Sequence, residues 1–500
     1  MKILIVNGPR TKAPMFTLRD EICFQDVKYV PFPMRLAMTA ALVRDAGHEV
    51  KVIDANALRL TWEELEPLLV PCDAVITQSA AGVLDHDMKL APMVKKACGK
   101  STRFVMIETV ISPIFPERVM ADYPDCDVLI RGQLERVIPE LLKNWPHPEK
   151  TAGLVVRDSH GKVHVTPEAN PLSVEELNQL PFMAYDLFPM EKYSISYLDA
   201  PMHERVIPGI RMRTTRDCPF KCPFCIIGST KARGYDAKLR ALEAKRAADE
   251  IEHVVRTYGI KGIFFWDETF TYNRERCIAF LNELIARNLG LTWRCLTRVD
   301  CLDDEIIALM ARAGCKMIEF GIESGDPAGR KSHHKGFSNE KAIEIVRKVR
   351  EAGILVNCDM IVGMPWDSWE SVKMTENLAL DMRADGLHLT IAFPYPGTKL
   401  YEIAEQEKLL EVDDIYKTMI EERVRVRLKP TLKTRTMSSD DVLKAWTQTR
   451  TAINKTYLRR NVLMRPWAFW PVVRHAESPA HLMRMIPKGI RLLAGKLNQY

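Results

Sequence analysis

The chain has 500 residues, of which 47% are hydrophobic and 27% are charged, and these values exclude a mostly disordered or fibrous protein. At roughly 150 residues per domain, the length predicts about three domains. No run of about 18 apolar residues without charge occurs, which excludes a membrane-spanning helix of the usual length.

The positive charge of the chain is concentrated near its C-terminus. The net charge is +6, yet residues 423–500 hold 17 Lys or Arg and 3 acidic residues, a net charge of +14, so the other 422 residues carry −8. The basic segment also contains Trp446, Trp467, Phe469 and Trp470. Two interpretations fit this pattern: the segment packs on the acidic part of the chain, or it meets an anionic surface such as a membrane or a phosphorylated or lipid-borne substrate.

The first 165 residues alternate apolar runs with helical patterns. The start of the chain has no small-residue cleavage site after its apolar run, so we interpret it as a strand rather than a signal peptide and expect a cytoplasmic protein. Strands are expected at 2–7, 48–53, 74–77, 104–107 and 128–130, a hairpin at 154–156 and 163–165, and helices at 33–46, 88–97 and 135–142. This order predicts a doubly wound parallel sheet, which binds ligands at the carboxyl ends of its strands.

A second series of strands and helices follows a linker. Residues 171–189 are rich in proline and acids and are interpreted as part of a linker over 166–205. Strands are then expected at 210–215, 262–265, 292–296, 316–320, 355–362 and 386–393, with helices at 238–257, 273–288, 303–313, 339–352 and 369–382. Six β/α units predict a partial or full barrel over 206–415, and residues 416–500 form a basic helical region.

The strongest motif is a group of three cysteines directly after the strand at 210–215. Nine of the twelve cysteines are scattered, but Cys218, Cys222 and Cys225 lie within eight residues. Thiolates bind zinc or iron–sulfur clusters, and structural zinc needs four ligands. No fourth Cys or His follows at the usual spacing, whereas three ligands on a four-iron cluster leave one iron open for a small molecule.

This cysteine spacing, with Phe224 before the last cysteine, resembles the signature of the radical SAM family. The resemblance implies that Cys218, Cys222 and Cys225 hold a [4Fe–4S] cluster. It also implies that the open iron chelates S-adenosylmethionine, whose reductive cleavage gives a 5′-deoxyadenosyl radical. An electron donor of the flavodoxin or ferredoxin type would then be a partner.

Further residues match this family at the ends of the later strands. Asp267 and Glu268 lie where the methionine amino group is held, and Glu323 and Ser324 resemble the ribose-binding strand. The turn Gly363-Met364-Pro365 resembles the family's glycine–proline turn, and Arg298 is a further expected cofactor contact. After this turn the commoner Gly-Glu-Thr is replaced by Trp366-Asp367-Ser368. No catalytic residue beyond the cluster ligands is predicted.

A doubly wound domain before such a barrel resembles the cobalamin-binding subclass of the family. The loop 78–82 would then approach the corrin, with Ser79 as a polar contact, and Gly132 lies in a segment similar to the subclass's Gly-Glu-Gly-Glu motif. The Asp-x-His-x-x-Gly motif that ligates cobalt in other B12 proteins is absent, so cobalt would bind no protein imidazole. His86 is interpreted as a surface residue.

The resemblance implies C-methylation of an unactivated carbon in a small-molecule or lipid substrate, and no nucleic-acid partner. Relatives instead close, contract or oxidise rings of lipids or tetrapyrroles, and that alternative stays open. A methylthiotransferase would need three N-terminal cluster cysteines, for which Cys23, Cys72, Cys98 and Cys126 are available, and a C-terminal β-barrel. The last alternative is a non-catalytic cobalamin sensor.

Overall fold

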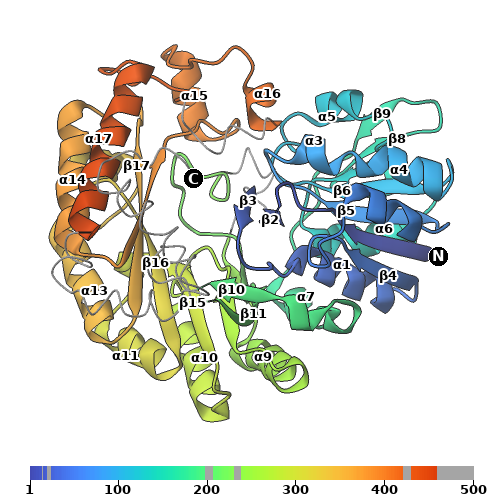
Figure 1. Ribbon diagram of the computed structural model, residues 1–500, viewed down its shortest axis with the longest axis horizontal. Coiled ribbons are helices and arrows are strands. Elements are labelled where there is room, and N and C mark those ends of the chain that lie inside the picture. The colour runs from blue at the N-terminus through green and yellow to red at the C-terminus, as the bar shows by residue number, and fades with distance from the viewer. Residues whose placement is uncertain (14, 20–23, 197–205, 230–237, 421–429, 459–500) are drawn as a thin grey trace, which may run out of the picture.

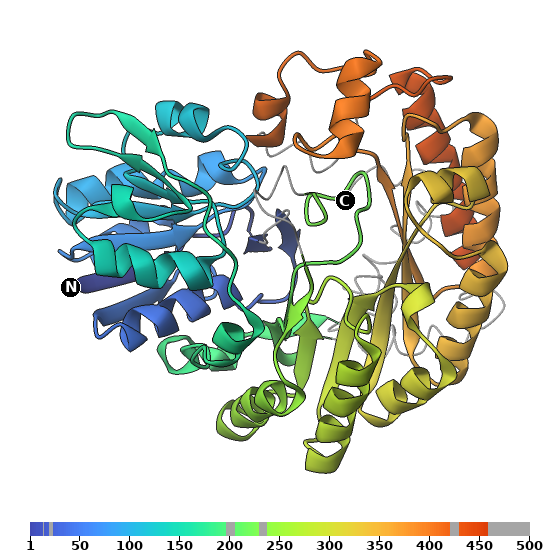
Figure 2. The ribbon, with the colours of Figure 1, turned by 180° about the vertical axis from the view of Figure 1, so that it is seen from behind.

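The computed structural model describes residues 1–13, 15–19, 24–196, 206–229, 238–420 and 430–458. Two seven-stranded sheets lie side by side, each covered by helices (Figures 1 and 2). The predicted α/β fold class, a doubly wound sheet followed by a partial barrel and a helical C-terminal part, is confirmed.

The first sheet has the strand order β4-β1-β5-β6-β7-β8-β9. Its five parallel strands are β1 (Lys2–Asn7), β4 (Glu49–Asp54), β5 (Ala74–Gln78), β6 (Arg103–Ile107) and β7 (Val128–Ile130). The predicted hairpin, β8 (Leu154–Arg157) and β9 (Val163–Val165), extends the sheet with antiparallel pairing. The parallel strands reverse their order between β1 and β5, which creates a switch point at the carboxyl edge.

Both faces of the first sheet are covered because successive side chains of a strand point to opposite sides. Ile3 and Ile5 of β1 pack in one apolar cluster with α1 (Met34–Asp45) and α6 (Leu134–Asn144). Leu4 and Val6 pack in another cluster with α4 (Leu90–Ala97) and α5 (Pro116–Asp122). The apolar run of β1 is thereby buried on both sides, as expected for a central parallel strand.

The second sheet is an open half-barrel with the order β10-β11-β14-β15-β16-β17-β18. Six strands are parallel: β11 (Val206–Met212), β14 (Gly262–Phe265), β15 (Thr292–Thr297), β16 (Cys315–Glu323), β17 (Leu355–Val362) and β18 (Gly386–Ile391). The short β10 (Ser194–Ser196) is antiparallel at one edge. The covering helices are α9 (Ala244–Tyr258), α10 (Arg274–Arg287), α11 (Asp304–Arg312), α13 (Asn339–Glu351) and α14 (Trp369–Met382).

Two of the differences from the sequence prediction affect the surroundings of the cysteine loop and the linker. The helix expected at 238–257 begins only at Ala244, because Arg240–Ala241 forms a strand, β13, that pairs with β12 (Thr215–Arg216) before the cysteine loop. The segment 171–189 is more than a linker: it contains α7 (Val174–Asn178), and Tyr185 is buried and donates a hydrogen bond to Glu250 of the barrel.

The described C-terminal part is helical, with α15 (Lys399–Gln406), α16 (Ile415–Ile420) and α17 (Ser439–Leu458). Trp446 of α17 is buried, and its indole donates a hydrogen bond to the Leu389 carbonyl of β18, so this aromatic residue packs on the barrel rather than facing a partner. Of the other basic residues of the predicted segment, Lys433 and Arg435 form ion pairs with Glu411 and Glu407. The basic residues at 423–429 and the basic and aromatic residues from Arg459 onward lie outside the described residues.

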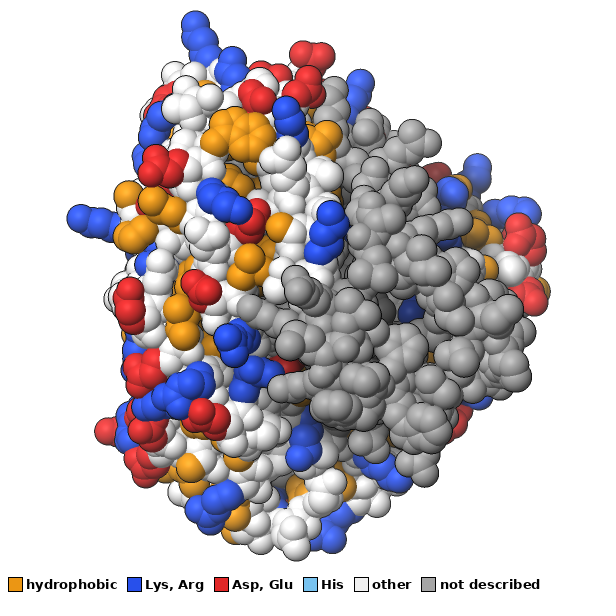
Figure 3. Space-filling model, turned by 60° about the vertical axis from the view of Figure 1, so that its left-hand side comes forward, with side chains coloured by type: hydrophobic (Ala, Val, Ile, Leu, Met, Phe, Trp, Pro, Cys, Tyr) orange, Lys and Arg blue, Asp and Glu red, His pale blue; other side chains and the backbone are white. Residues whose placement is uncertain are grey.

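No helix among the described residues is both long and apolar enough to cross a membrane. Where Figure 3 shows the described helical flank of the barrel, Lys and Arg side chains alternate with Asp and Glu rather than forming a field of one sign.

Candidate cluster site and interdomain cleft

The three motif cysteines lie on one tight loop that follows β12. The backbone N–H of Cys225 donates to the Cys222 carbonyl at 3.1 Å. At Gly228 an added Cβ would lie 2.3 Å from the Phe220 carbonyl oxygen, so only glycine allows the loop to fold back on itself. The loop therefore holds the three thiols near one another, as a shared cluster requires.

The charges around these thiols suit a metal cluster. Burial raises the pKa of Cys225 to about 12 and also raises the pKa values of Cys218 and Cys222. The thiols are therefore protonated at neutral pH unless a metal displaces the proton. At Cys222 the positive charges of Lys335 and Arg298 oppose the effect of burial on the pKa.

Lys335 is a residue of this site that sequence reasoning missed. Its ammonium forms an ion pair with Glu323 at 3.0 Å and donates to the Gly321 carbonyl at 3.0 Å, and both side chains are nearly buried. Glu323 ends β16 with φ +69°, and a Cβ at Gly321 would lie 2.6 Å from its Oε1. The only sequence signal was the position of Lys335 in a polar stretch after a strand end.

The two acids after β14 play different parts. The Asp267 carboxylate is fully buried and accepts hydrogen bonds from the backbone N–H and the hydroxyl of both Thr214 and Thr215. These four bonds join β14 to the strand before the cysteine loop, so Asp267 positions that loop. Glu268 lines the interdomain cleft and pairs with Arg213 at 3.4 Å, so it is the acid of the two that a ligand can meet.

Of the remaining predicted barrel residues, Arg298 contacts the cysteine loop, and the others lie at the carboxyl ends of β16 and β17. Arg298 stacks on the ring of Phe220, with its guanidinium carbon 3.7 Å from the ring centroid, and pairs with Asp300. Ser324 accepts a hydrogen bond from the Asp326 N–H at 3.1 Å. Gly363 has φ +89°, and the Pro365 carbonyl accepts from Arg435. The structure thus brings these positions to one end of the barrel.

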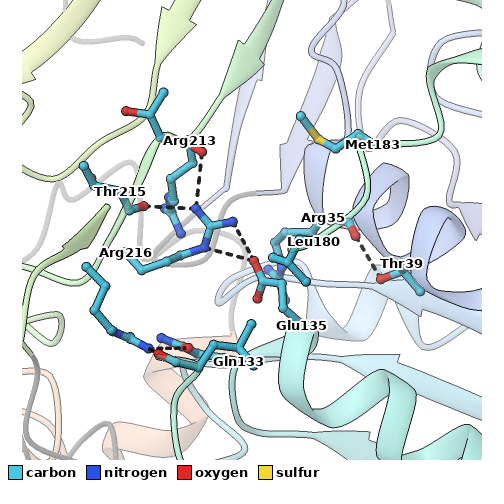
Figure 4. A network of polar contacts seen from close by, with 12 residues as sticks. Arg35, Thr39, Gln133, Glu135, Leu180, Met183, Arg213, Thr215 and Arg216 are labelled. Atoms are coloured by element: carbon cyan, nitrogen blue, oxygen red, sulfur yellow. Dashed lines mark hydrogen bonds and ion pairs between the residues drawn. The ribbon is translucent and has the colours of Figure 1, made fainter. Parts of the chain in front are cut away.

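A cleft lies between the end of the barrel that carries the cysteine loop and the carboxyl edge of the first sheet. The first sheet contributes Arg35, Thr109, Pro113, Arg131, Gly132, Gln133, Leu134 and Glu135, and the barrel contributes Arg213, Arg216, Asp217, Ile227 and Glu268. Arg216 donates from Nη2 to Glu135 Oε1 at 2.7 Å, and its Nη1 donates to the carbonyls of Arg213 and Thr215 (Figure 4). This ion pair links the two sides of the cleft, because Glu135 belongs to the first sheet's domain and Arg216 to the barrel. The sequence analysis did not predict a role for Arg216.

The predicted corrin contacts are split between two places. Gly132 lines the cleft, but Ser79 is buried and is not among the cleft residues; its N–H donates to the Ile107 carbonyl at 3.0 Å. The preceding Gln78 lines a smaller cavity at the β1–β5 switch point with Asn7 and Arg35, and its buried Oε1 accepts no hydrogen bond from the described residues. This buried, unpaired acceptor fits a ligand that carries amide donors.

No histidine is among the described residues that line either cavity. The interpretation of His86 as a surface residue is wrong. The ring of His86 is half-buried, contacts the Pro9 carbonyl at 3.1 Å and packs on Trp62.

Three of the N-terminal cysteines lie at the opposite edge of the first sheet. Cys72 and Cys126 lie two residues before β5 and β7, and Cys98 caps α4 in the segment before β6, so all three lie toward the amino ends of parallel strands. The Cys126 thiol is fully buried and contacts the Val128 carbonyl. Cys23 lies outside the described residues. The three described cysteines are therefore remote from the cleft, which argues against a second cluster beside the first.

Residues 212–379 match the family model described as the radical SAM superfamily, and this match includes all three cysteines of the loop. Residues 212–379 therefore form a radical SAM domain. The matched segment runs from the end of β11 into α14, so the radical SAM domain is the half-barrel described above.

Full-length relatives extend the similarity beyond the radical SAM domain. An uncharacterized methyltransferase of Pyrococcus horikoshii is 28% identical over 436 residues, which cover 87% of this chain and 89% of the relative. An anaerobic magnesium-protoporphyrin IX monomethyl ester cyclase of Rubrivivax gelatinosus is 28% identical over 392 residues, which cover 74% of this chain and 66% of the cyclase.

A solved structure has the same two-sheet arrangement. The cobalamin-dependent S-adenosylmethionine radical enzyme OxsB, solved with aqua-cobalamin and S-adenosylmethionine bound, matches with a TM-score of 0.67 at 14% identity. The match covers 99% of this chain and 72% of OxsB. The radical SAM domain and the preceding doubly wound sheet therefore share the fold of a cobalamin-dependent radical SAM enzyme.

Proposed function

We propose that this radical SAM enzyme methylates an unactivated carbon of a small molecule, with a [4Fe–4S] cluster, S-adenosylmethionine and cobalamin as its cofactors. One observation carries the proposal: Asp217 and Ile227, which flank the three cysteines, line a single cleft together with the carboxyl edge of the first sheet. A radical formed at the loop and a group carried by a cofactor on the first sheet would therefore meet the same substrate.

In the barrel, Cys218, Cys222 and Cys225 would be the metal ligands, and Glu268, Arg298, Glu323, Ser324, Gly363 and Pro365 surround the S-adenosylmethionine site. When bound, the cluster supplies the electron that cleaves S-adenosylmethionine, and cobalamin supplies the methyl group. Asp267 holds the loop strand in place through Thr214 and Thr215. Lys335 and Arg298 offset negative charge on the thiolates, which stabilises a bound cluster electrostatically.

On the other wall, Gly132 lines the cleft and would lie against the flat macrocycle. Gln78 offers an amide oxygen at the switch point. Because the sequence lacks the Asp-x-His-x-x-Gly motif, cobalt would be bound without a protein imidazole. Glu135 and Arg216 bridge the walls and hold the two cofactor sites at a constant separation.

The methyltransferase relative, which matches most of the chain, supports methyl transfer as the reaction. The Rubrivivax relative, named as a cyclase, favours a second candidate: ring closure on a tetrapyrrole without methyl transfer. A flavodoxin or ferredoxin would supply the electron in either reaction.

The test uses anaerobically reconstituted full-length protein supplied with cobalamin and S-adenosylmethionine carrying a deuterated methyl group. We expect the protein to bind about four irons and one corrinoid per chain. With cell extract as the source of substrate, we expect 5′-deoxyadenosine and a product that carries the deuterated methyl group. The triple Cys218→Ala, Cys222→Ala, Cys225→Ala variant should lose iron and 5′-deoxyadenosine while keeping corrinoid. As a matched control, Cys72→Ala with Cys98→Ala should retain all of these.

Different results exclude different parts of the proposal. 5′-Deoxyadenosine formation by the triple variant would overturn the assignment of the cluster ligands. Absence of corrinoid uptake would overturn the assignment of the first sheet. A product without the deuterated label, formed only when corrinoid is present, would favour the cyclase type of reaction over methylation.

A further inference from the structure

Three metal-ligating side chains lie together on the inner face of the half-barrel. Glu319, Asp359 and His388 come from the neighbouring strands β16, β17 and β18. The next residues after the two acids, Phe320 and Met360, belong to the apolar core beneath the covering helices, so both carboxylates point to the opposite face. Asp359 and His388 are partners in the parallel register, which places the imidazole on that same face.

The three side chains are close enough to bind one ion. One ligand atom of each lies within 4.8 Å of the ligand atoms of the other two. His388 Nδ1 lies 3.1 Å from Asp359 Oδ1 and 3.8 Å from Glu319 Oε1. Two ligand atoms bound at about 2.1 Å from a metal ion lie about 3.0–3.4 Å apart at neighbouring octahedral or tetrahedral positions. A small movement of Glu319 would therefore bring all three atoms within coordination distance of a single ion.

The charges of this group favour a bound cation. Burial and the negative charge of Asp359 raise the pKa of Glu319, whereas the positive charge of Arg294 opposes this rise. Arg294 pairs with Glu319 Oε2 at 3.2 Å, which leaves Oε1 as the oxygen nearer to His388. Two neighbouring carboxylates repel each other unless a proton or a cation lies between them. A divalent cation would remove that repulsion at neutral pH.

The surroundings allow an ion to enter and supply a further polar atom. The exposed fractions of the side chains are 47% for His388, 31% for Asp359 and 12% for Glu319, so the imidazole side of the group is open to solvent. The side-chain amide of Asn357 lies 3.1 Å from His388 Nδ1. A half-turn of that amide exchanges its oxygen and nitrogen, so Asn357 can present an oxygen to the same point.

We propose that Glu319, Asp359 and His388 bind a divalent transition-metal ion of the Mn²⁺, Fe²⁺ or Zn²⁺ kind. Carboxylate oxygens combined with an imidazole nitrogen suit these ions, whereas Mg²⁺ and Ca²⁺ prefer oxygen ligands alone. Three protein ligands leave positions open for water or for an oxygen atom of a bound small molecule. On β16 the site lies roughly 13 Å along the strand from Glu323 at the cysteine-loop end, so this inference goes beyond the proposed function and does not depend on it.

The experiment titrates Mn²⁺ into the full-length, cluster-loaded protein under anaerobic conditions. The protein is kept free of corrinoid, and its cluster is kept in the oxidised, spin-paired state, so that electron spin resonance reports only Mn²⁺. We expect about one Mn²⁺ per chain, displaced by Zn²⁺, because the three ligands surround a single point. Glu319→Gln, Asp359→Asn and His388→Ala should each lower the affinity at least about tenfold. Pulsed spectra of bound Mn²⁺ should show coupling to an imidazole nitrogen, and His388→Ala should remove it.

A second ion pair of the same residue types provides the matched control. Asp158 and His164 of the β8–β9 hairpin lie 2.8 Å apart, and their side chains are 32% and 38% exposed. No third ligand group accompanies them among the described residues. Asp158→Asn combined with His164→Ala should therefore leave the Mn²⁺ affinity unchanged.

Melting temperatures separate metal binding from folding. Without metal, Asp359→Asn should melt at the same temperature as the wild type or higher, because the change removes a repulsion between carboxylates. Mn²⁺ should raise the melting temperature of the wild type but not that of Asp359→Asn, since only a protein that binds the ion in its folded state is stabilised by it.

Two results would overturn the metal site. Absence of saturable Mn²⁺ and Zn²⁺ binding in the millimolar range would show that the two carboxylates share a proton instead. Equal Mn²⁺ affinity in the wild type and all three variants would show that the ion binds elsewhere on the chain. Iron content and 5′-deoxyadenosine formation of the wild type test the proposed function separately, so either proposal can fail while the other stands.

Discussion

Asp367 shows how a single buried carboxylate shapes the turn after β17. Its Oδ2 accepts hydrogen bonds from the backbone N–H groups of Gly363 at 2.8 Å and Met364 at 3.0 Å. Ser368 caps α14 and accepts from the Ser371 N–H. Asp367 therefore stabilises the turn, and Ser368 caps the following helix.

The buried position of Asp367 predicts a pH dependence of stability. Burial raises its pKa to about 7 against the backbone hydrogen bonds that lower it. Because the folded pKa lies above the unfolded value, the stabilisation is complete below about pH 4 and is lost as the pH rises through about 7. In Asp367→Asn the amide oxygen can still accept from both N–H groups, but the side chain no longer titrates.

We therefore expect the stability of the wild type relative to Asp367→Asn to fall by up to about 4 kcal/mol between pH 4 and pH 8. Urea unfolding at a series of pH values measures this difference. Asp367→Ala, which removes the acceptor, should be destabilised at every pH. Parallel curves for the wild type and Asp367→Asn would contradict the raised pKa.

At the scale of elements, a buried ion pair holds the β2–β3 hairpin against the first sheet. β2 (Phe16–Arg19) and β3 (Phe24–Val27) pair antiparallel, and Arg19 binds the Asp87 carboxylate of α3 (Leu84–Asp87) through Nε and Nη2. Arg19 also donates to the Pro9 carbonyl at 2.7 Å. Both charged side chains are at most 2% exposed, so each depends on the other for its hydrogen bonds.

Breaking that pair should be costly. Asp87→Asn leaves the Arg19 charge buried without its counter-charge, and we expect a loss of about 3 kcal/mol in the free energy of unfolding. Adding Arg19→Met should recover part of the loss, because no unpaired charge then remains. A double-mutant cycle in urea measures the coupling. The exposed pair of Lys96 with Glu66 serves as a control, and Glu66→Gln should cost less than about 0.5 kcal/mol.

At the scale of the whole molecule, two separate sets of contacts are among those that join the two sheets. Arg216 pairs with Glu135 beside the cysteine loop. The second set joins α16 to α5: Arg118 pairs with Asp414, and the Tyr416 hydroxyl donates to Asp122 at 2.7 Å. In Figure 1 these helices lie beside each other at the top of the molecule. The cleft is therefore bounded by contacts that belong to distant parts of the chain.

Weakening the α5–α16 contact should loosen the cleft without unfolding either sheet. In Arg118→Ala with Tyr416→Phe, the charge pair, the cation–π contact at 4.1 Å and one hydrogen bond are lost. We expect about 1–2 kcal/mol of destabilisation, faster amide exchange in α16, and faster release of bound corrinoid.

Hydrogen exchange and corrinoid off-rates test this expectation. The matched control is Arg347→Ala, which breaks an exposed ion pair with Glu351 on α13, far from the contact, and should change neither quantity. Unchanged exchange in α16 of the double variant would show that the α5–α16 contact does not hold the cleft closed.

Local sequence patterns determined the order of strands and helices and the cysteine loop. The strands at 128–130 and 355–362 were predicted with the bounds that the structure has, because their apolar runs end at turn residues. The cysteine spacing was sufficient to identify a radical SAM domain, since all three ligands lie on one short loop.

Only the tertiary structure decided which distant residues meet. Arg216 and Glu135 are 81 residues apart, and nothing in either local pattern indicates their ion pair. The sequence predicts that Asp267 binds a ligand, yet its carboxylate accepts hydrogen bonds from Thr214 and Thr215 before the cysteine loop. Glu319, Asp359 and His388 come from three separate strands. Periodicity and spacing report on neighbours along the chain, whereas these contacts depend on how the sheet and helices pack, which places strand ends from separate segments at one edge.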